Sequence, residues 1–231
     1  MLRLSLVLLT ACELSPLNVE TGTLEKLRIV QVSSSQDFTE IELHVVDKAK
    51  NPRDVKVRIG VCVDNECPVT RPIKEVQIEE GTATRLGDCW WSYRFSAAPF
   101  FAAEEVPPAR LQAVQQPRAY IYAEADDGVQ SDRTFVSLHE LFTERAPFTI
   151  GITDENGAPV EALAPKGRYV VMRDPPGATR WYVSANALVT ERKAPRTTIE
   201  LVRAVKGERV YVFAVGNGGV GAFSAAAFDV R

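Results

Sequence analysis

Short runs in which apolar and polar residues alternate fill the chain from residue 25 onward. Alternation of period two puts successive side chains on opposite faces, as a half-buried β-strand requires. Gly, Pro, Asp and Asn separate the runs, which are rich in β-branched and aromatic residues. The pattern predicts strands at 25–33, 39–47, 55–63, 73–79, 89–95, 118–125, 133–138, 148–160, 167–174, 179–185, 197–204, 208–215 and 221–230. Helical patterns are weak and confined to 99–105 and 138–145, so the chain is expected to be all-β.

The second half of the chain repeats the first at a fixed shift in residue number. Adding 91 to the first number of each of these pairs gives the second: Trp90 and Trp181, Trp91 and Tyr182, Tyr120 and Tyr211, Tyr122 and Phe213, Ala123 and Ala214, Gly128 and Gly219, Val129 and Val220. Matching aromatic residues in register without a gap indicate duplication of one domain type. We therefore expect two tandem domains at 25–138 and 148–231, joined by a linker at 139–147.

The repeated pattern resembles tandem immunoglobulin-like or fibronectin type III-like β-sandwiches. Those families place an apolar residue six positions before a tyrosine whose hydroxyl bonds a turn backbone, an arrangement called the tyrosine corner. The spacing recurs here in two sets, Val114, Pro117 and Tyr120, and Val205, Gly207 and Tyr211. The resemblance implies two antiparallel sandwiches, with Trp90 or Trp91 buried in the first core and Trp181 in the second. Such a fold does not by itself imply a function.

The first residues, MLRLSLVLLTAC, have the layout of a secretory signal: a cation at Arg3, an apolar run at 4–9, then small residues. The stretch Leu-Thr-Ala-Cys resembles a bacterial lipobox. The resemblance implies that 1–11 are a lipoprotein signal peptide, that Cys12 carries the lipid, and that 12–24 form a tether. Glu13 in place of Asp after the cysteine favours the outer membrane of the cell envelope. A competing interpretation makes 4–12 a buried first strand with Cys12 as a small apolar filler.

Length and composition limit the function further. The chain has 231 residues, 45% hydrophobic, with a formal net charge of -3 and a pI near 5.6. That is enough apolar sequence for one large core or two of ordinary size. We find no Lys/Arg cluster interleaved with aromatic residues, so nucleic acid is not an expected partner.

Three cysteines remain once Cys12 is set aside. A two-residue turn at 64–65 would put Cys62 opposite Cys67 on neighbouring strands, where a disulfide can form. The rival is a bridge from either of them to Cys89, which would close a longer loop. A zinc site is disfavoured because three thiols lack a fourth ligand nearby, and no metal is expected.

Gly216, Gly218 and Gly221 spell G-x-G-x-x-G after an apolar run, the pattern of a dinucleotide-binding loop. Such a loop needs a following helix, and the residues after Gly221 instead alternate like a closing strand. The shift of 91 also lays this segment over Asp127-Gly128, a dipeptide typical of hairpin turns. We predict a turn here and no nucleotide or other cofactor.

No catalytic motif stands out among the residues that carry chemistry. His44 and His139 lie in separate regions. The carboxylates gather at 64–66, 124–127 and 154–155, where hairpin tips favour Asp because its side chain bonds the local backbone. A calcium or polar-ligand site at these tips is the functional alternative.

Phe100 and Phe101 are adjacent in the longest irregular stretch, so one of them is a candidate contact for a partner, the alternative being that both cover the first core. The sequence thus predicts a membrane-anchored envelope lipoprotein that acts as a non-catalytic binding, adhesion or assembly module with a protein or glycan partner. The alternatives are an extracellular hydrolase that uses two loop carboxylates, and a structural subunit of an envelope complex.

Overall fold

The structure is a computed structural model of the whole chain. It describes residues 26–34, 40–48, 50–63, 77–96, 119–137, 147–184, 186–191, 193–216 and 222–231. The predicted signal peptide and tether lie outside these residues, as do the two segments with weak helical patterns, 99–105 and 138–145.

Every predicted run overlaps a strand of the structure. The strands are β1 (Arg28–Ser34), β2 (Glu40–Val46), β3 (Lys56–Val63), β4 (Gln77–Thr82), β5 (Thr84–Gly87), β6 (Trp90–Ser96), β7 (Ala119–Asp126), β8 (Ser131–Ser137), β9 (Thr149–Thr153), β10 (Arg168–Asp174), β11 (Thr179–Val183), β12 (Ala187–Val189), β13 (Arg196–Leu201), β14 (Arg209–Gly216) and β15 (Phe223–Asp229). The alternation missed only β5 and β12, two short strands at sheet edges.

Strands β1 to β8 form the first sandwich. One sheet has the order β1-β2-β6-β5 and the other β4-β3-β7-β8, all antiparallel. In immunoglobulin terms these are sheets A-B-E-D and C′-C-F-G. Alternate residues of both sheets point inward, and the ring of Trp91 lies fully buried among Val45, Ile59 and Ile121 in one core.

Strands β9 to β15 form the second sandwich, with sheets β12-β13-β10-β9 and β11-β14-β15. This is the seven-strand immunoglobulin order, D-E-B-A on one side and C-F-G on the other. Trp181, Val171 and Val212 belong to its core. The prediction of an all-β chain of two antiparallel immunoglobulin-like sandwiches is confirmed.

The repeat at shift 91 is right for one strand pair and wrong for another. On β7 and β14, Ala123 and Ala214 both face a core, and the matched strands occupy the same place in each sandwich. The tryptophan match is a coincidence. Trp90 lies on β6 and faces away from the first core, whereas Trp181 lies on β11, a strand equivalent to β3, and fills the second core. The residue of the first core at that place is Ile59, since Ile59 pairs with Ala123 as Trp181 pairs with Ala214.

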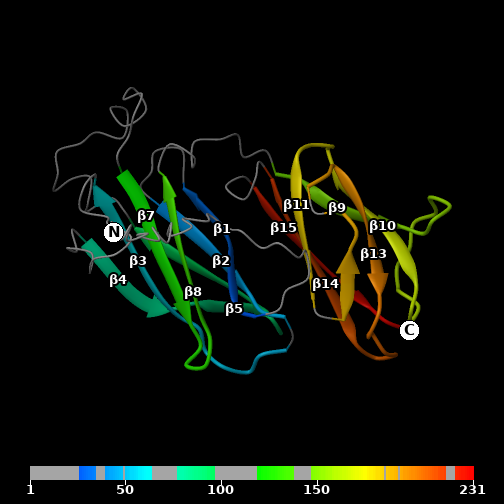
Figure 1. The fold of residues 1–231 in the computed structure, drawn as a ribbon, viewed down its shortest axis with the longest axis horizontal. Coiled ribbons are helices and arrows are strands. Elements are labelled where there is room, and N and C mark those ends of the chain that lie inside the picture. Colours follow the sequence, from blue (N-terminus) through cyan, green and yellow to red (C-terminus); the bar gives the residue numbers. More distant parts are fainter. Residues whose placement is uncertain are drawn as a thin grey trace, which may run out of the picture.

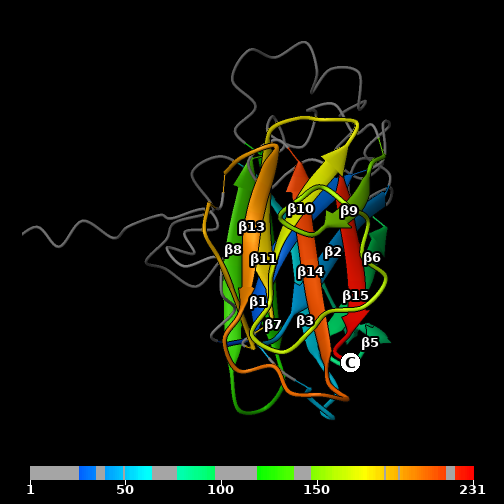
Figure 2. The ribbon, with the colours of Figure 1, turned by 90° about the vertical axis from the view of Figure 1, so that its right-hand side faces the viewer.

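The two sandwiches are stacked face to face, so that four sheets follow one another along the long axis of the molecule (Figure 1). The outer face of sheet β1-β2-β6-β5 packs on the outer face of sheet β11-β14-β15. Viewed along the stack, the sheets overlie one another with their strands in the same general direction (Figure 2). A third apolar cluster fills this interface and consists of Val30, Val46, Cys89, Tyr182, Tyr211, Phe213 and Val215, with Trp90, Phe223 and Ala225 partly buried against it.

A β-bulge adapts β1 to this interface. The pairing of β1 with β2 shifts register between Ile29 and Gln31. The extra residue, Val30, therefore joins the interface cluster, while Ile29 and Val32 stay in the core of the first sandwich. The strand thus supplies apolar side chains to both of the layers between which it lies.

Candidate functional site: a cavity at the junction of the two sandwiches

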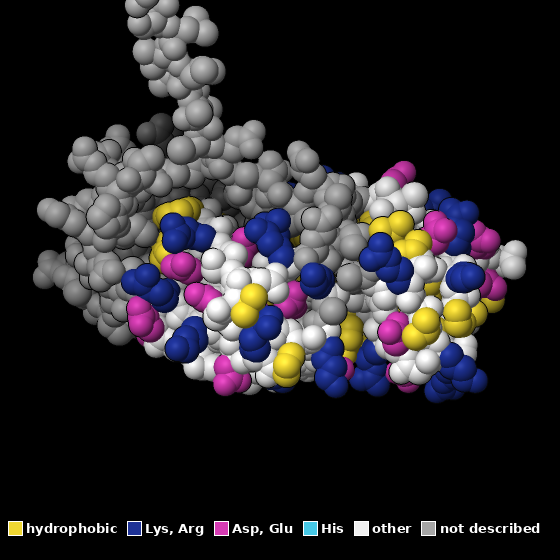
Figure 3. Space-filling model, turned by 60° about the horizontal axis from the view of Figure 1, so that its bottom comes forward, with side chains coloured by type: hydrophobic (Ala, Val, Ile, Leu, Met, Phe, Trp, Pro, Cys, Tyr) yellow, Lys and Arg dark blue, Asp and Glu magenta, His cyan; other side chains and the backbone are white. Residues whose placement is uncertain are grey.

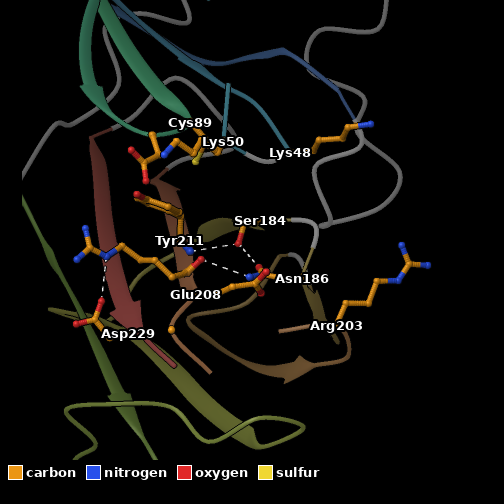
Figure 4. Close-up of a pocket in the computed structure, with 12 residues that line it drawn as sticks. Lys48, Lys50, Cys89, Ser184, Asn186, Arg203, Glu208, Tyr211 and Asp229 are labelled. Atoms are coloured by element: carbon orange, nitrogen blue, oxygen red, sulfur yellow. Dashed lines mark hydrogen bonds and ion pairs between the residues drawn. The ribbon is translucent and has the colours of Figure 1, made fainter. Parts of the chain in front are cut away.

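A cavity of about 730 Å³ lies where the two sandwiches meet, at one edge of the apolar interface (Figure 4). Both sandwiches line it. The first supplies Lys48, Lys50, Asp88 and Cys89, and the second supplies Ser184, Asn186, Arg203, Gly207, Glu208, Arg209, Tyr211 and Asp229. Small-molecule sites often form at such domain junctions, in concave spaces of this size.

The wall from the first sandwich is fixed by backbone hydrogen bonds. The loop after β2 donates from Asp47 N to Cys89 O (2.9 Å) and from Asn51 N to Asp88 O (2.9 Å). Arg85 then donates from Nη1 to Asn51 O at 2.6 Å. These bonds tie the loop that carries Lys48 and Lys50 to the turn that carries Asp88, so the wall is a defined surface.

A buried polar cluster supports that loop from behind. The amide of Asn51 donates from Nδ2 to Asp47 (2.8 Å) and to Asp127 (2.7 Å), which lies in the turn between β7 and β8. Arg53 Nε lies 3.1 Å from the same carboxylate. Burial on its own would raise the pKa of Asp127, but hydrogen bonds from the backbone of Gln130 and Val129, and from Asn51 and Arg53, outweigh it and lower the pKa. The carboxylate therefore stays ionised and holds the loop.

The wall from the second sandwich is built around Ser184, where β11 ends (Figure 4). Its hydroxyl donates to Asn186 Oδ1 (2.5 Å) and accepts from Tyr211 N (3.2 Å). Asn186 Nδ2 donates in turn to Arg209 O (3.3 Å). The polar groups of Ser184 and Asn186 are engaged in these hydrogen bonds, so the two side chains shape the cavity wall. The charged residues of the cavity are then the groups that can recognise a ligand.

The charged residues around the cavity differ in how far they are engaged. Arg209 Nε pairs with Asp229 at 3.1 Å, and Glu208 Oε2 accepts a hydrogen bond from Val205 N at 3.0 Å. Lys48, Lys50 and Arg203 form no ion pair with any other residue that the structure describes. The cavity thus presents cations from both sandwiches that have no ion-pair partner in the described part of the chain. Beside them lie the engaged carboxylates of Glu208 and Asp229 and the exposed carboxylate of Asp88.

Cys89 is the point where cavity and apolar interface meet. Its thiol is free and buried, with 1% of the residue exposed. Burial, and to a smaller degree the charges of Asp47 and Asp88, raise the pKa of Cys89 to about 12. The sulfur is therefore a protonated, weakly polar group at neutral pH and not a nucleophile.

His44 lies in the same interface, on the outer face of β2. Its ring stacks on Phe223 of the second sandwich, with centroids 4.1 Å apart and planes 12° apart. Trp90 Nε1 donates a hydrogen bond to His44 Nδ1 at 3.1 Å, which requires a neutral ring with an unprotonated Nδ1. Burial lowers the pKa of His44 to about 4; the charge of Glu42 opposes this shift and that of Arg94 adds to it.

Most of the residues proposed from the sequence as sites lie outside the described residues. These are Cys12, Cys67, Phe100 and Phe101. Cys62 lies on β3 with its backbone opposite Tyr120, and its side chain is outside the described part. The disulfide between Cys62 and Cys67 therefore stays a prediction.

The tyrosine corner predicted at Tyr211 is wrong. Its ring packs between the sandwiches, and its hydroxyl bonds the backbone of Asp88 in the first sandwich and the side chain of Arg209. Because the residue joins the two domains, its spacing from Val205 and Gly207 does not serve a turn within one of them. The first set is not testable here, since Val114 and Pro117 lie outside the described residues.

The predicted turn chemistry is confirmed at two of the three acidic tips, and the third, at 64–66, lies outside the described residues. Asp126 accepts from Gly128 N (2.6 Å), Asp127 from Val129 N and Gln130 N (both 2.8 Å), and Asp154 from Asn156 N (2.9 Å) and Ala158 N (2.8 Å). Gly128, with φ of 84°, opens the two-residue turn Gly128-Val129, one position later than predicted. Within the described part of the chain, no group of three or more His, Cys, Asp or Glu could hold a metal ion.

The glycine-rich segment joins two antiparallel strands. Val215 pairs with Phe223, and Gly216 N donates to Ala222 O at 2.9 Å. The segment after Gly221 forms β15, as predicted, where a dinucleotide loop would need a helix. Residues 217–221 themselves lie outside the described part. No helix in the described residues has the length and apolar character needed to cross a bilayer.

Comparison with known proteins identifies no family: no family profile and no curated protein matches the sequence. Among solved structures, similarity extends to a red sea bream transglutaminase, at 10% identity and a TM-score of 0.30 over 89% of this chain. The chain spans only 31% of the length of that enzyme.

Two other similar structures contain tandem domains. One is Dpr2 Ig1-Ig2 in complex with DIP-Theta Ig1-Ig3, at 7% identity and a TM-score of 0.24, covering 89% of this chain and 99% of that one. The other is the titin z1z2 domains in complex with telethonin, at 16% identity and a TM-score of 0.22, covering 90% and 95%. The strand order described above defines the fold.

Proposed function

We propose that the protein is a lipid-anchored lipoprotein of the cell envelope, in the outer membrane, that acts as a non-catalytic binding, adhesion or assembly module. Cys12 carries the lipid in this proposal, and the tether at 12–24 connects it to the first sandwich. Fully extended, the tether reaches at most about 40 Å, so the sandwiches work close to the membrane surface.

The observation that carries the binding role is the cavity shared by the two sandwiches. A space of about 730 Å³ lined from both domains exists only while they are docked, so the stacked arrangement itself creates a recognition surface. Its unpaired cations, Lys48, Lys50 and Arg203, favour a partner or ligand that bears anionic groups. Of its three carboxylates, Glu208 and Asp229 are held by Val205 N and Arg209. Asp88 therefore has no second free carboxylate beside it among the described lining residues, which supports recognition over acid-base catalysis.

The binding role is tested by capturing partners from the envelope of the native cell. We expect the wild-type chain to retain a partner that the double variant Lys50→Ala/Arg203→Ala loses, since both cations line the cavity. The matched control is Lys193→Ala/Arg196→Ala, which removes two exposed cations outside the cavity. Equal capture by all three chains would refute the cavity as the binding site. A stoichiometric complex that survives mild detergent would identify the protein as a structural subunit.

The anchor is tested separately by the substitution Cys12→Ser. We expect the wild-type chain to remain with membranes after a wash in high salt, because acyl chains hold it there independently of charge. The Cys12→Ser chain is expected to wash off. Retention of both chains after the wash would contradict the lipid anchor, and release of both would do the same.

A further inference from the structure

We propose that the face around the mouth of the cavity binds the surface of an anionic phospholipid bilayer. This face, called here the basal face, consists of residues 47–48, 50–55, 127–130 and 202–208, and it lies at the bottom of Figure 1. The inference rests on the proposed lipid anchor, because an anchored chain is held next to lipid. Beyond the anchor, the inference identifies the side of the molecule that contacts the membrane and the residues that make this contact.

Exposed apolar side chains at the tips of turns are the first observation. Val129, in the turn between β7 and β8, is 72% exposed. Val205 (57%) and Val202 (40%) lie in the turn between β13 and β14 of the other sandwich. Apolar side chains at the tips of turns can enter the headgroup region of a bilayer.

Cations surround these tips. Lys48, Lys50, Arg203 and Lys206 are all exposed on the basal face, and none forms an ion pair with another described residue. Figure 3, in which this side of the molecule comes forward, shows hydrophobic side chains among Lys and Arg, with Asp and Glu interspersed. Phosphate groups of lipid headgroups are the complementary partner, and each Lys or Arg near an anionic surface raises the affinity roughly fivefold.

The carboxylates of the basal face are mostly engaged inside it. Asp47 accepts from Asn51 Nδ2, Asp127 pairs with Arg53, and Glu208 accepts from Val205 N. Asp54 is the remaining one; it is exposed and forms no ion pair with another residue of the described chain. The face therefore turns its free cations outward and keeps most of its anionic groups occupied.

The chain also enters the fold on this side. Arg28, the first residue of β1, pairs with Val46 at the end of β2, and Val46 directly precedes the basal face. Lys26, exposed, lies just before it. A tether that starts from a lipid on Cys12 thus reaches the first sandwich at its basal end, which brings this face toward the bilayer with no need to wrap around the molecule.

The two halves of the face are held in a fixed relation, so they can meet one flat surface together. Arg85 donates to the carbonyls of Asn51 (2.6 Å) and Arg53 (2.7 Å). Gly207 N donates to Val230 O (2.8 Å), which fixes the turn of the second sandwich. The apolar interface joins the sandwiches, so binding carries no entropy cost for ordering either turn.

The test measures binding of the full chain carrying Cys12→Ser, and therefore without lipid, to vesicles. Vesicles of phosphatidylcholine with about a third phosphatidylglycerol are compared with pure phosphatidylcholine, by co-sedimentation at low ionic strength. We expect binding to the anionic vesicles alone, lost at high salt. Lys48→Glu/Lys206→Glu is expected to bind more than about 30-fold more weakly, since the loss of two attractive charges alone gives roughly that factor and the new carboxylates are repelled as well.

The matched control is Lys193→Glu/Arg196→Glu, an equal change of charge on exposed residues at the opposite strand ends. It is expected to bind within about twofold of the parent, whereas Val129→Ser/Val205→Ser is expected to bind several-fold more weakly at low ionic strength. Absence of vesicle binding by the parent, or equal effects of the two charge variants, would overturn the proposal. A basal face that bound a protein partner and no vesicles would overturn it as well. Vesicle binding does not depend on Cys12, so failure of the lipid anchor would appear only in the salt-wash experiment.

Discussion

Protonation of His44 is expected to weaken the docking of the two sandwiches. The neutral ring accepts the hydrogen bond from Trp90 Nε1 and stacks on Phe223 across the interface. A protonated ring has a hydrogen on both nitrogens, so it would face the Trp90 donor with a donor of its own. It would also bury a charge whose nearest carboxylate, Glu42, lies 3.9 Å from Nε2, while Arg94 opposes the charge. From β1 and β15, the described neighbours Gln31 and Phe223 add no titratable group.

The size of the effect follows from the pKa. Burial lowers the pKa of His44 from 6.5 to about 4 in the folded protein. The unfolded chain therefore binds more protons below pH 6.5, and the free energy of unfolding falls as the pH drops from about 6.5 toward 4. At pH 5 the loss of unfolding free energy amounts to about 2 kcal/mol, because each pH unit below the unfolded-state pKa of 6.5 costs about 1.36 kcal/mol. Above pH 7 the contribution of His44 is complete and constant.

Urea unfolding at pH 7.5 and at pH 5 measures this difference, with His44→Phe as the test variant and His139→Phe as the control. Phe keeps an aromatic ring beside Phe223 but cannot titrate. We expect the wild type and the control to lose about 2 kcal/mol more than His44→Phe between the two pH values. In an NMR titration the signal that His44→Phe removes is expected to titrate near pH 4. Titration of that signal near 6.5, with the same pH dependence of stability in all three chains, would refute the buried, neutral His44.

Three further outcomes follow from the contacts. Gly128→Ala is expected to lower the free energy of unfolding by about 1 kcal/mol, measured in urea, since φ at this position is 84°; an unchanged value would contradict the turn. Asp127→Ala is expected to cost about 3 kcal/mol, because the donors of Asn51 and Arg53 lose a buried partner, and a loss under 1 kcal/mol would contradict that network. The Cys89 thiol, with its pKa raised to about 12, is expected to resist alkylation at pH 8 until urea is added, as peptide mass mapping would show; rapid labelling of the native chain would contradict its burial.

Strand positions could be predicted well from sequence because inward and outward residues alternate when one face of a sheet is covered. The two missed strands show where that signal fails. β5 and β12 are short edge strands, and β5 carries mostly exposed side chains, so neither has an alternating pattern to detect. The stacking of the sandwiches was also detectable in principle. β14 is buried along both faces, with Val210 and Val212 in one core and Tyr211 and Phe213 in the interface, and such continuous apolar runs indicate a sheet covered on both sides.

The shift of 91 residues matches two tryptophans that are not equivalent in the fold, and the reason is physical. Trp91 and Trp181 each fill a core of similar size, but they do so from different strands, β6 and β11. A core must be filled to a given volume, but the side chain that fills it can come from any of several strands. A large aromatic ring can therefore stand in one sheet of the first sandwich and in the other sheet of the second. The cavity could not be predicted from the sequence at all. Lys48, Asp88 and Glu208 come from turns far apart in the chain, and only the docking of the sandwiches brings them together.

Stacking of the sandwiches as one rigid body is the claim on which the cavity and the basal face both depend. Residual dipolar couplings of backbone amides test it directly in solution, at pH 7. The account predicts that one alignment tensor fits the couplings of β1–β8 and β9–β15 together. Two tensors of different magnitude or orientation, one for each sandwich, would contradict it.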